Sequence, residues 1–384
     1  MSTLLRGRIL TGAGDRSHSW LRIDADHVLG TGDSGDPGDN GEPGDTVVDL
    51  GDALVVPGFV DLHGHGGGGG AYTTTDADEA SAVADFHLRH GSTTAMASLV
   101  TAELDLIERQ IRTLAPLVDD GILAGIHLEG PWLSYECRGA HDPALLRDPD
   151  PAEVDRLLRA GDGRIRMVTL APERPGGLAA IRQVIQAGAI AAVGHTAADV
   201  DTTRQAVEAG ASVATHLFNG MSPIHHRAPG PVVALLESPE VTVELIADGH
   251  HLHPAAIGFA VDHAGRDRVA LITDAMAATG MGDGDYDIGG RPVSVRGGLV
   301  RLAGGTGSIA GSTLTTSAAA RYVASTVGRS WHEVVTMAAT TPARALGRTD
   351  IGSLEPGRRA DLLVLGGDGE LRGVMRAGRW VVEP

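Results

Sequence analysis

Short runs of apolar residues recur along the central part of the chain, and each run ends in polar residues followed by a helix-like stretch. Unbroken apolar runs of this length are typical of parallel strands that are buried on both faces. Eight strand–helix units of this kind predict an α/β fold, a TIM-type (β/α)8 barrel, with an open doubly wound sheet as the alternative. The eight runs are Ala53–Leu62, Thr94–Val100, Ile122–Leu128, Ile165–Leu170, Ala189–Val193, Ala211–Thr215, Val241–Ala247 and Val269–Thr273.

The two ends of the chain differ from this central part and resemble each other. We expect residues 1–52 and 348–384 to pair into one small β-sandwich-like domain, which is interrupted by the barrel at residues 53–347. The strands predicted for this domain lie at residues 3–10, 19–30, 351–365 and 371–382.

Three further segments lie outside the repeating pattern. Residues 31–46 consist of Gly, Asp and Pro with almost no apolar residue, which predicts a solvated loop. Residues 286–312 form a glycine-rich, β-like segment after the last barrel run, and helical stretches at 313–327 and 331–346 follow it.

The composition excludes several classes of enzyme. The chain of 384 residues has 31 cationic side chains, and every one of them is an arginine. Without lysine, the chain can perform no Schiff-base chemistry, form no ordinary P-loop and bridge no metal pair with a carboxylated lysine. The formal net charge of -18 argues against binding to nucleic acid, which requires a basic surface.

Cysteine usage and hydropathy bear on the compartment. Cys137 is the only cysteine, so no intramolecular disulfide forms, which is typical of a reducing compartment. Residues 1–10 contain no apolar stretch that fits a signal peptide, and no apolar window approaches the length of a membrane span. We therefore expect a cytoplasmic protein without a membrane partner.

Polar side chains that can bind a metal ion follow five of the apolar runs. His63 and His65 follow the first run, and alternate residues of a strand share one face, so this pair can bind one ion. The carboxyl ends of barrel strands meet at one mouth, where reactive groups lie. The combination of imidazoles and carboxylates predicts a divalent ion, for which zinc is favoured and iron, cobalt and manganese stay open. The later runs are followed by Glu129, His195, His216 and Asp274.

These residue types together indicate a hydrolase. A divalent ion lowers the pKa of a water molecule and polarises a carbonyl group. A carboxylate beside the ion can take up the proton and later give it to a leaving amine. Asp274 follows the last barrel run and is the candidate for this acid and base.

Longer motifs around these residues resemble one family across about residues 53–365. The string VVPGFVDLHGHG, followed by Glu, His, His and Asp on later strands, resembles the amidohydrolase superfamily. The resemblance is closest to its N-acetylglucosamine-6-phosphate deacetylases, which implies hydrolysis of N-acetyl-D-glucosamine 6-phosphate to glucosamine 6-phosphate and acetate, in amino-sugar catabolism. The strings that carry it are HLEGPWLS, VGHTAAD, THLFNGMSPIHHRAPG, IADGHHLHP, LITDAMAATG and GSLEPGRRADLLVL.

The resemblance implies roles at the reacting centre. Glu129, His195 and His216 match the main metal ligands of the family, and Asp274 matches the catalytic acid and base. His141 matches a histidine on a loop over the sugar, where we expect it to help polarise the acetyl carbonyl.

The resemblance also implies contacts with the rest of the substrate. His251 matches a substrate-contacting histidine, and Asn219 and Gly220 match the turn near the phosphate. Arg227 matches an arginine that reaches the phosphate from a neighbouring subunit, so we expect a homodimer.

The number of metal ions depends on the first histidine pair. Some members of the family lack this pair and hold one ion, so one or two ions per subunit are expected. This chain keeps His63 and His65, which favours two ions. Because the chain contains no lysine, Glu129 is the residue expected to bridge them.

Two other functions stay open at the level of the sequence. One is a different amidohydrolase, dihydroorotase-like or isoaspartyl-dipeptidase-like, acting on a cyclic amide or another N-acyl substrate. The absence of lysine disfavours those members that use a carboxylated lysine. The other is a non-catalytic barrel that binds a sugar phosphate as a sensor.

Overall fold

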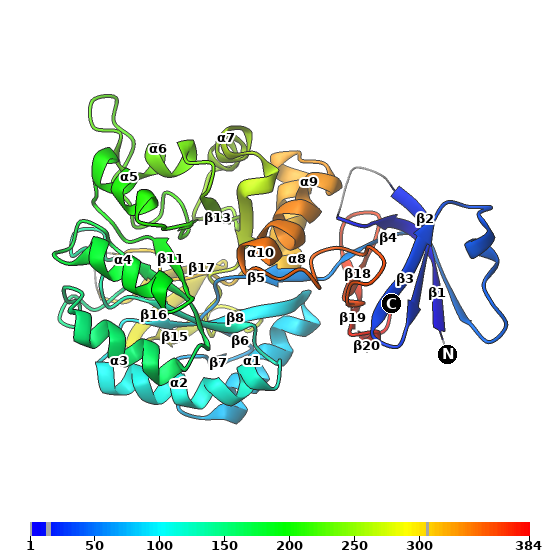
Figure 1. Cartoon of the computed structure of the whole chain (residues 1–384), viewed down its shortest axis with the longest axis horizontal. Coiled ribbons are helices and arrows are strands. Elements are labelled where there is room, and N and C mark those ends of the chain that lie inside the picture. The colour runs from blue at the N-terminus through cyan, green and yellow to red at the C-terminus, as the bar shows by residue number, and fades with distance from the viewer. Residues whose placement is uncertain (1, 13–16, 305–306) are drawn as a thin grey trace. The chain divides into compact units, whose positions relative to one another are not determined.

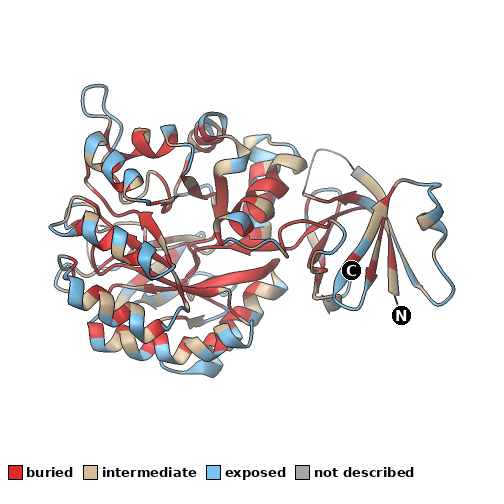
Figure 2. Ribbon diagram, in the orientation of Figure 1, coloured by how far each residue is buried: buried red, intermediate tan, exposed pale blue. Residues whose placement is uncertain are grey.

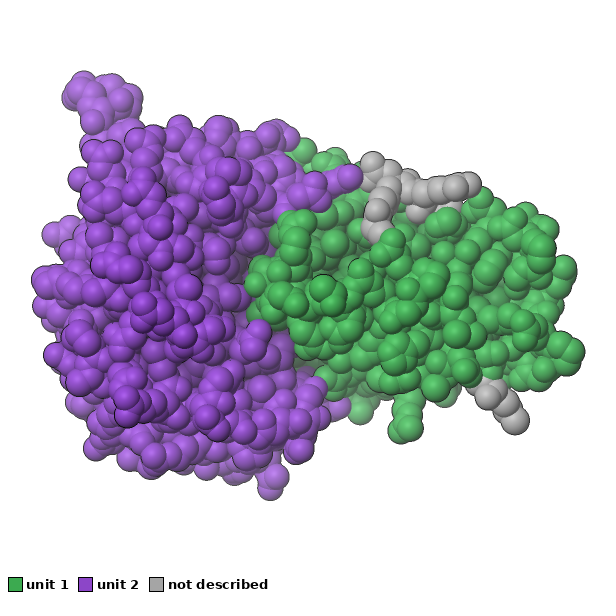
Figure 3. Space-filling model, in the orientation of Figure 1, with its two compact units in different colours: residues 1–61, 87–94, 315–384 green, residues 62–86, 95–314 purple. Residues whose placement is uncertain are grey.

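The computed structural model describes residues 2–12, 17–304 and 307–384. The chain divides into two compact units, one spanning residues 1–61, 87–94 and 315–384 and the other spanning residues 62–86 and 95–314 (Figure 3). The domain boundaries predicted after residues 52 and 347 stay a prediction.

Strands from both ends of the chain form one mixed sheet of seven strands, in the order β20-β19-β18-β4-β1-β2-β3. Strand β1 runs parallel to β4 and antiparallel to β2. Leu5, Ile9, Val55 and Leu362 share its buried core. The predicted small β domain built from both ends is thereby confirmed. The strands are β1 (Ser2–Leu10), β2 (Ser17–Asp24), β3 (His27–Gly32), β4 (Thr46–Pro57), β18 (Leu362–Leu365), β19 (Leu371–Arg376) and β20 (Arg379–Val382).

The acidic segment predicted as a loop at residues 31–46 forms one between β3 and β4, at residues 33–45, and arginines tie it to this sheet. It contains one short 3-10 helix, η1 (Pro37–Asn40). Arg6 pairs with Asp39 at 3.1 Å, and Arg22 pairs with Glu42 at 2.8 Å and also with Asp45. These ion pairs hold a loop that has almost no apolar residue of its own to pack.

Eight parallel strands form a near-closed barrel, in the order β14-β13-β12-β11-β10-β9-β8-β5. A parallel bridge between Gly64 and Ala275 joins the segments that follow the two end strands. The barrel prediction is confirmed over the open doubly wound sheet. The strands are β5 (Phe59–Asp61), β8 (Ser92–Val100), β9 (Gly125–Glu129), β10 (Ile165–Leu170), β11 (Ile190–Val193), β12 (Val213–Ala214), β13 (Thr242–Ile246) and β14 (Val269–Ile272).

A helix follows each barrel strand along the chain (Figure 1). In α2, Ile107, Ile111 and Leu114 are buried at three- and four-residue spacing, the pattern of a helix with one apolar face (Figure 2). The carboxylates of Asp150 and Asp199 cap the first turns of α3 and α5. The helices are α1 (Ala77–Arg89), α2 (Leu104–Asp119), α3 (Pro151–Gly161), α4 (Gly177–Gln186), α5 (Val200–Glu208), α6 (Gly230–Glu237), α7 (Pro254–Ala264) and α8 (Thr316–Tyr322).

The first apolar run is divided between the two sheets. Its residues up to Pro57 belong to β4, and Phe59–Asp61 form β5 of the barrel. Gly58 stands at the break, where a Cβ atom would lie 2.1 Å from Thr93 Oγ1. Both halves of the run are buried, so the hydrophobic pattern alone does not show the division.

The glycine-rich segment between β14 and α8 forms an antiparallel sheet of three strands, as its β-like pattern predicted. These strands are β15 (Gly284–Ile288), β16 (Arg291–Arg296) and β17 (Leu299–Leu302). Within the described ranges, no helix is both long enough and apolar enough to cross a membrane. The remaining elements are β6 (Gly66–Gly67), β7 (Gly70–Ala71), η2 (Arg266–Arg268), η3 (Val323–Val327), α9 (Trp331–Val335), η4 (Thr336–Thr340) and α10 (Thr341–Ala345).

Candidate metal centre and active site

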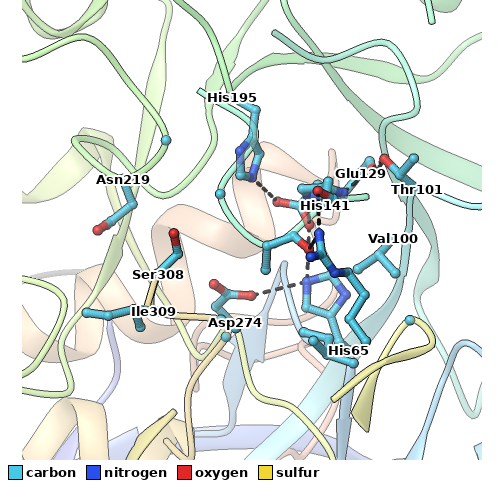
Figure 4. A pocket seen from close by; sticks show the side chains of 18 of the residues that line it. His65, Val100, Thr101, Glu129, His141, His195, Asn219, Asp274, Ser308 and Ile309 are labelled. Atoms are coloured by element: carbon cyan, nitrogen blue, oxygen red, sulfur yellow. Dashed lines mark hydrogen bonds and ion pairs between the residues drawn. The ribbon is translucent and has the colours of Figure 1, made fainter. Parts of the chain in front are cut away.

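The barrel gathers the predicted metal ligands and Asp274 at the carboxyl ends of its strands (Figure 4). Glu129 is the last residue of β9, and His195, His216 and Asp274 each lie two residues beyond the end of a strand. These last three residues adopt positive φ angles of 46°, 29° and 49°. Such a conformation is costly for residues other than glycine and persists where the surrounding structure imposes it, often at functional sites.

Three of the predicted ligands meet at one point. The Oε1 atom of Glu129 lies 2.9 Å from His216 Nε2 and 3.1 Å from His195 Nε2. The two Nε2 atoms lie 3.2 Å apart. All three side chains are buried, so the structure brings together the residues predicted as the main ligands.

A second group stands beside the first and shares Glu129 with it. His63 Nε2 and His65 Nε2 are 3.0 Å apart, and Asp274 Oδ1 lies 3.1 Å from His65 Nε2. Glu129 directs Oε1 toward His63 Nε2 at 3.6 Å and Oε2 toward His65 Nε2 at 3.3 Å. Two buried triads of potential ligands, His63–His65–Asp274 and Glu129–His141–His195, therefore fit a binuclear site.

Hydrogen bonds at Nδ1 of two of these histidines leave their Nε2 atoms, which face the other ligands, suited to bind a metal ion. His65 Nδ1 lies 3.1 Å from the carbonyl oxygen of Ser98, and His195 Nδ1 lies 2.8 Å from that of Cys137. A carbonyl only accepts, so each Nδ1 carries a hydrogen, and in its neutral form each ring presents a lone pair at Nε2. Cys137 thus contributes its backbone here, while its thiol is half-buried.

The electrostatics of the group also call for a cation. Burial acts to lower the pKa of His65, but hydrogen bonds and charge from Asp274 and Glu129 outweigh it and raise this pKa to about 9. Burial acts to raise the pKa of Asp274, but the charges of His63 and His65 hold it below its usual range. The buried carboxylates therefore require positive charge beside them, which protons or a divalent ion can supply.

His141 differs from the other histidines. Burial lowers its pKa to about 4, against a hydrogen bond to Glu129 that acts to raise it, so the ring is neutral near pH 7. Its Nδ1 atom lies 2.9 Å from Thr101 Oγ1, and its Nε2 atom lies 3.4 Å from Glu129 Oε2. Because the carboxylate of Glu129 only accepts, the hydrogen of the neutral ring lies on Nε2, where it points into the site.

Glu244, a residue that the sequence analysis missed, contacts one histidine of each group. Its side chain is fully buried on β13, and its Oε2 atom lies 3.4 Å from His63 Nδ1 and accepts the backbone N–H of His216 at 3.2 Å. The available signal was a single carboxylate inside the apolar run Val241–Ala247. Thr101, directly after the run Thr94–Val100, was missed in the same way.

The site opens into a pocket of about 320 Å³. Asn219, Gly220 and His251 line it together with the metal-site residues. Gly220 has a φ of 58°, and a Cβ atom there would lie 2.7 Å from His195 Nδ1, so this position requires glycine. Arg227 is exposed and is not part of the pocket wall in the described chain, so its contact with a neighbouring subunit stays a prediction.

A comparison with protein families matches the amidohydrolase family over residues 54–381. This chain belongs to that family. The family membership that the resemblance of the motifs implied is thereby confirmed.

Individual relatives of this amidohydrolase carry more specific names. A mutant of N-acetyl-D-glucosamine-6-phosphate deacetylase from Mycobacterium smegmatis, solved in complex with N-acetyl-D-glucosamine-6-phosphate, is 48% identical and covers 100% of both chains with a TM-score of 0.94. The N-acetylgalactosamine-6-phosphate deacetylase of Escherichia coli O157:H7 is 39% identical over 317 residues, 81% of this chain and 83% of that protein. The N-acetylglucosamine-6-phosphate deacetylase of Lysinibacillus sphaericus is 35% identical over 330 residues, 85% of this chain and 84% of that protein.

Proposed function

We propose that this amidohydrolase removes the N-acetyl group of N-acetyl-D-glucosamine 6-phosphate, giving glucosamine 6-phosphate and acetate. The observation that carries the proposal is the 48% identity, over the full length of both chains, to a deacetylase solved with this sugar phosphate. The buried ligand groups and the acid beside them provide the chemistry that hydrolysis of an amide requires. Location in the cytoplasm stays a prediction from the single cysteine.

The residues that would hold the metal are those of the two groups. Glu129, His195 and His216 would hold one ion, and His63 and His65 would hold a second, with Glu129 close to both groups. Zinc is the proposed ion because imidazole and carboxylate ligands suit it. When bound, a divalent ion lowers the pKa of water and acts as a Lewis acid toward a carbonyl oxygen.

The chain's own residues perform the proton transfers. Asp274 is ionised, and its Oδ1 atom faces the ligand groups, so it can take the proton of the attacking water. Neutral His141 donates a hydrogen bond from Nε2 to the acetyl oxygen as negative charge develops there. When the tetrahedral intermediate collapses and the C–N bond breaks, Asp274 returns its proton to the departing amine nitrogen.

The sugar and its phosphate are held on the other side of the pocket. The Asn219–Gly220 turn and His251 line the pocket, and Asp248 fixes His251 by accepting a hydrogen bond of 2.7 Å from its Nδ1 atom. We propose that Arg227 of a second subunit completes the phosphate site, which makes the homodimer the active form. Against a net charge of -18, such local cations are needed to attract a dianion.

The metal content tests the binuclear arrangement directly. We expect the wild-type protein to hold two ions per subunit and the His65→Ala variant to hold one, because the group of Glu129, His195 and His216 stays intact. His263→Ala, which removes an exposed histidine on α7, is the matched control and should keep both ions. Metal analysis by mass spectrometry gives the counts; two ions in His65→Ala would contradict the assignment.

Acetate release from three sugars tests the substrate. We expect the highest kcat/KM with N-acetylglucosamine 6-phosphate, and a value about 100-fold lower with unphosphorylated N-acetylglucosamine, because charge-assisted hydrogen bonds to the phosphate are lost. The third sugar is N-acetylgalactosamine 6-phosphate, since a relative named for it is 39% identical. A higher kcat/KM with that sugar would make its deacetylation the function instead.

The two other functions left open by the sequence predict different results in this assay. Hydrolysis of a cyclic amide without acetate release from any of the sugars would assign a different amidohydrolase activity. Binding of the sugar phosphates with no acetate released would indicate a sensor. An enamidase of the same superfamily is 16% identical to this chain with a TM-score of 0.63. This likeness shows a shared fold and does not extend to the substrate.

A further inference from the structure

The three-stranded sheet β15–β17 lies between two loops that carry proposed catalytic residues. Its core contains Met276 and Ala278, which follow Asp274 in the chain, and Ala140, which precedes His141, packs against the same core. On the return from the sheet, the backbone N–H of Ser312 donates to the carbonyl oxygen of Asp274 at 2.7 Å. The sheet therefore packs against the segments that carry Asp274 and His141.

Arg291, the first residue of β16, reaches the loop of His141 directly. Its NH1 atom donates to the carbonyl oxygen of His141 at 2.9 Å and to that of Ala140 at 3.2 Å. Arg291 is also the only arginine among the described residues that line the active-site pocket. One guanidinium group thus binds two consecutive carbonyls at the point where the loop turns its histidine inward.

We propose that Arg291 is a positioning residue that sets the imidazole of His141 over the reacting centre. The proposal rests on the role given to His141 in the proposed function. Thr101 fixes the ring only through Nδ1, and the backbone of the loop contains two short turns. In these turns the N–H of His141 donates to the carbonyl of Arg138 and the N–H of Leu145 donates to the carbonyl of Asp142. Arg291 adds a constraint from outside the loop, because it binds the carbonyl of the histidine itself and that of its neighbour.

The contacts of Arg291 favour this role over direct binding of the phosphate. Its NH1 atom is already occupied by two backbone acceptors, and these belong to the loop of His141 rather than to the turn at Asn219 and Gly220. A residue that aligns a hydrogen-bond donor changes kcat, whereas a residue that binds the phosphate equally in the ground state and the transition state changes KM.

Two substitutions and a control test the proposal in the full-length, metal-loaded protein. We expect Arg291→Met to lower kcat about 100-fold, the size of effect that a misplacement of about 1 Å produces, with KM changed less than about threefold. Arg291→Lys keeps one charged donor and should recover part of the loss. Arg296→Met, on the same strand with a side chain 66% exposed, should keep wild-type kinetics.

A double substitution shows whether Arg291 acts through His141. If it does, adding Arg291→Met to His141→Ala lowers kcat by less than about twofold further, because the group being positioned is already gone. An equal loss in the presence and absence of His141, or a loss confined to KM, would overturn the proposal. Unchanged metal content and melting temperature show that the variants are folded.

Amide hydrogen exchange provides a readout that does not depend on the substrate. We expect faster amide exchange in the peptide that covers residues 138–146 of Arg291→Met, because two carbonyls of this loop lose their hydrogen bonds to the guanidinium. We expect no change in Arg296→Met. Unchanged exchange in Arg291→Met would contradict the proposal even if the chain acted on another sugar. Failure of wild-type deacetylation, in contrast, would concern only the proposed function.

Discussion

Replacing Asp274 with asparagine is expected to lower kcat about 1000-fold or more, because the amide can neither accept the proton of the attacking water nor return it to the amine. The carboxyl lies 3.1 Å from His65 and is held ionised by the charges of His63 and His65, so it is ready to act as a base. Its backbone is fixed by Ser312, and asparagine has nearly the same shape, so the site should keep its geometry.

This substitution separates catalysis from metal binding when both are measured on one sample. The ion at Glu129, His195 and His216 should remain, since none of those residues is changed. Asp285→Asn, an exposed aspartate on β15, serves as the control and should retain wild-type kcat. Near-normal turnover in Asp274→Asn would refute the role of Asp274 as the acid and base.

Replacing Glu129 with glutamine should remove metal binding and, with it, measurable turnover. Among the described residues, Glu129 is the only carboxylate that approaches all of the other ligands, at 2.9 to 3.6 Å from four histidine Nε2 atoms of the two groups. A neutral amide binds a divalent ion less tightly and takes the negative charge away from His195 and His216.

Thermal unfolding with and without added Zn²⁺ measures this effect independently of activity. An ion that binds only the folded protein stabilises it by about 2.7 kcal/mol at 100 times its Kd, so the wild-type melting temperature should rise on addition of zinc. The Glu129→Gln protein should show no rise, while Glu208→Gln, an exposed residue on α5, should behave as wild type. An equal rise in Glu129→Gln would place the metal elsewhere.

Much of the fold and of the metal centre was predictable, because the apolar runs locate the barrel strands and the residues after them locate the site. An apolar run marks a barrel strand, and the polar residue after it lies at the barrel mouth, so Glu129, His195 and His216 were placed by their position alone. Which sheet a buried run joins was not predictable, since β4 and β5 lie within one unbroken run.

Supporting residues were harder to predict, because their roles depend on contacts between distant segments. Glu244 lies inside an apolar run and reaches His63 across 181 residues of sequence. Arg291 acts on backbone carbonyls some 150 residues away, which have no side-chain signature. Spacing also did not separate His251 from its neighbours, whereas the structure pairs His251 with Asp248 and leaves His250 exposed.

The most direct test of the proposed deacetylation follows acetate and free amine in one reaction of the metal-loaded wild-type protein with N-acetylglucosamine 6-phosphate. We expect the two products to appear in equal amounts, to stop when a chelator removes the metal, and to resume when Zn²⁺ is added back. Binding of the sugar phosphate by the metal-loaded protein, with neither acetate nor amine released, would contradict the proposed function.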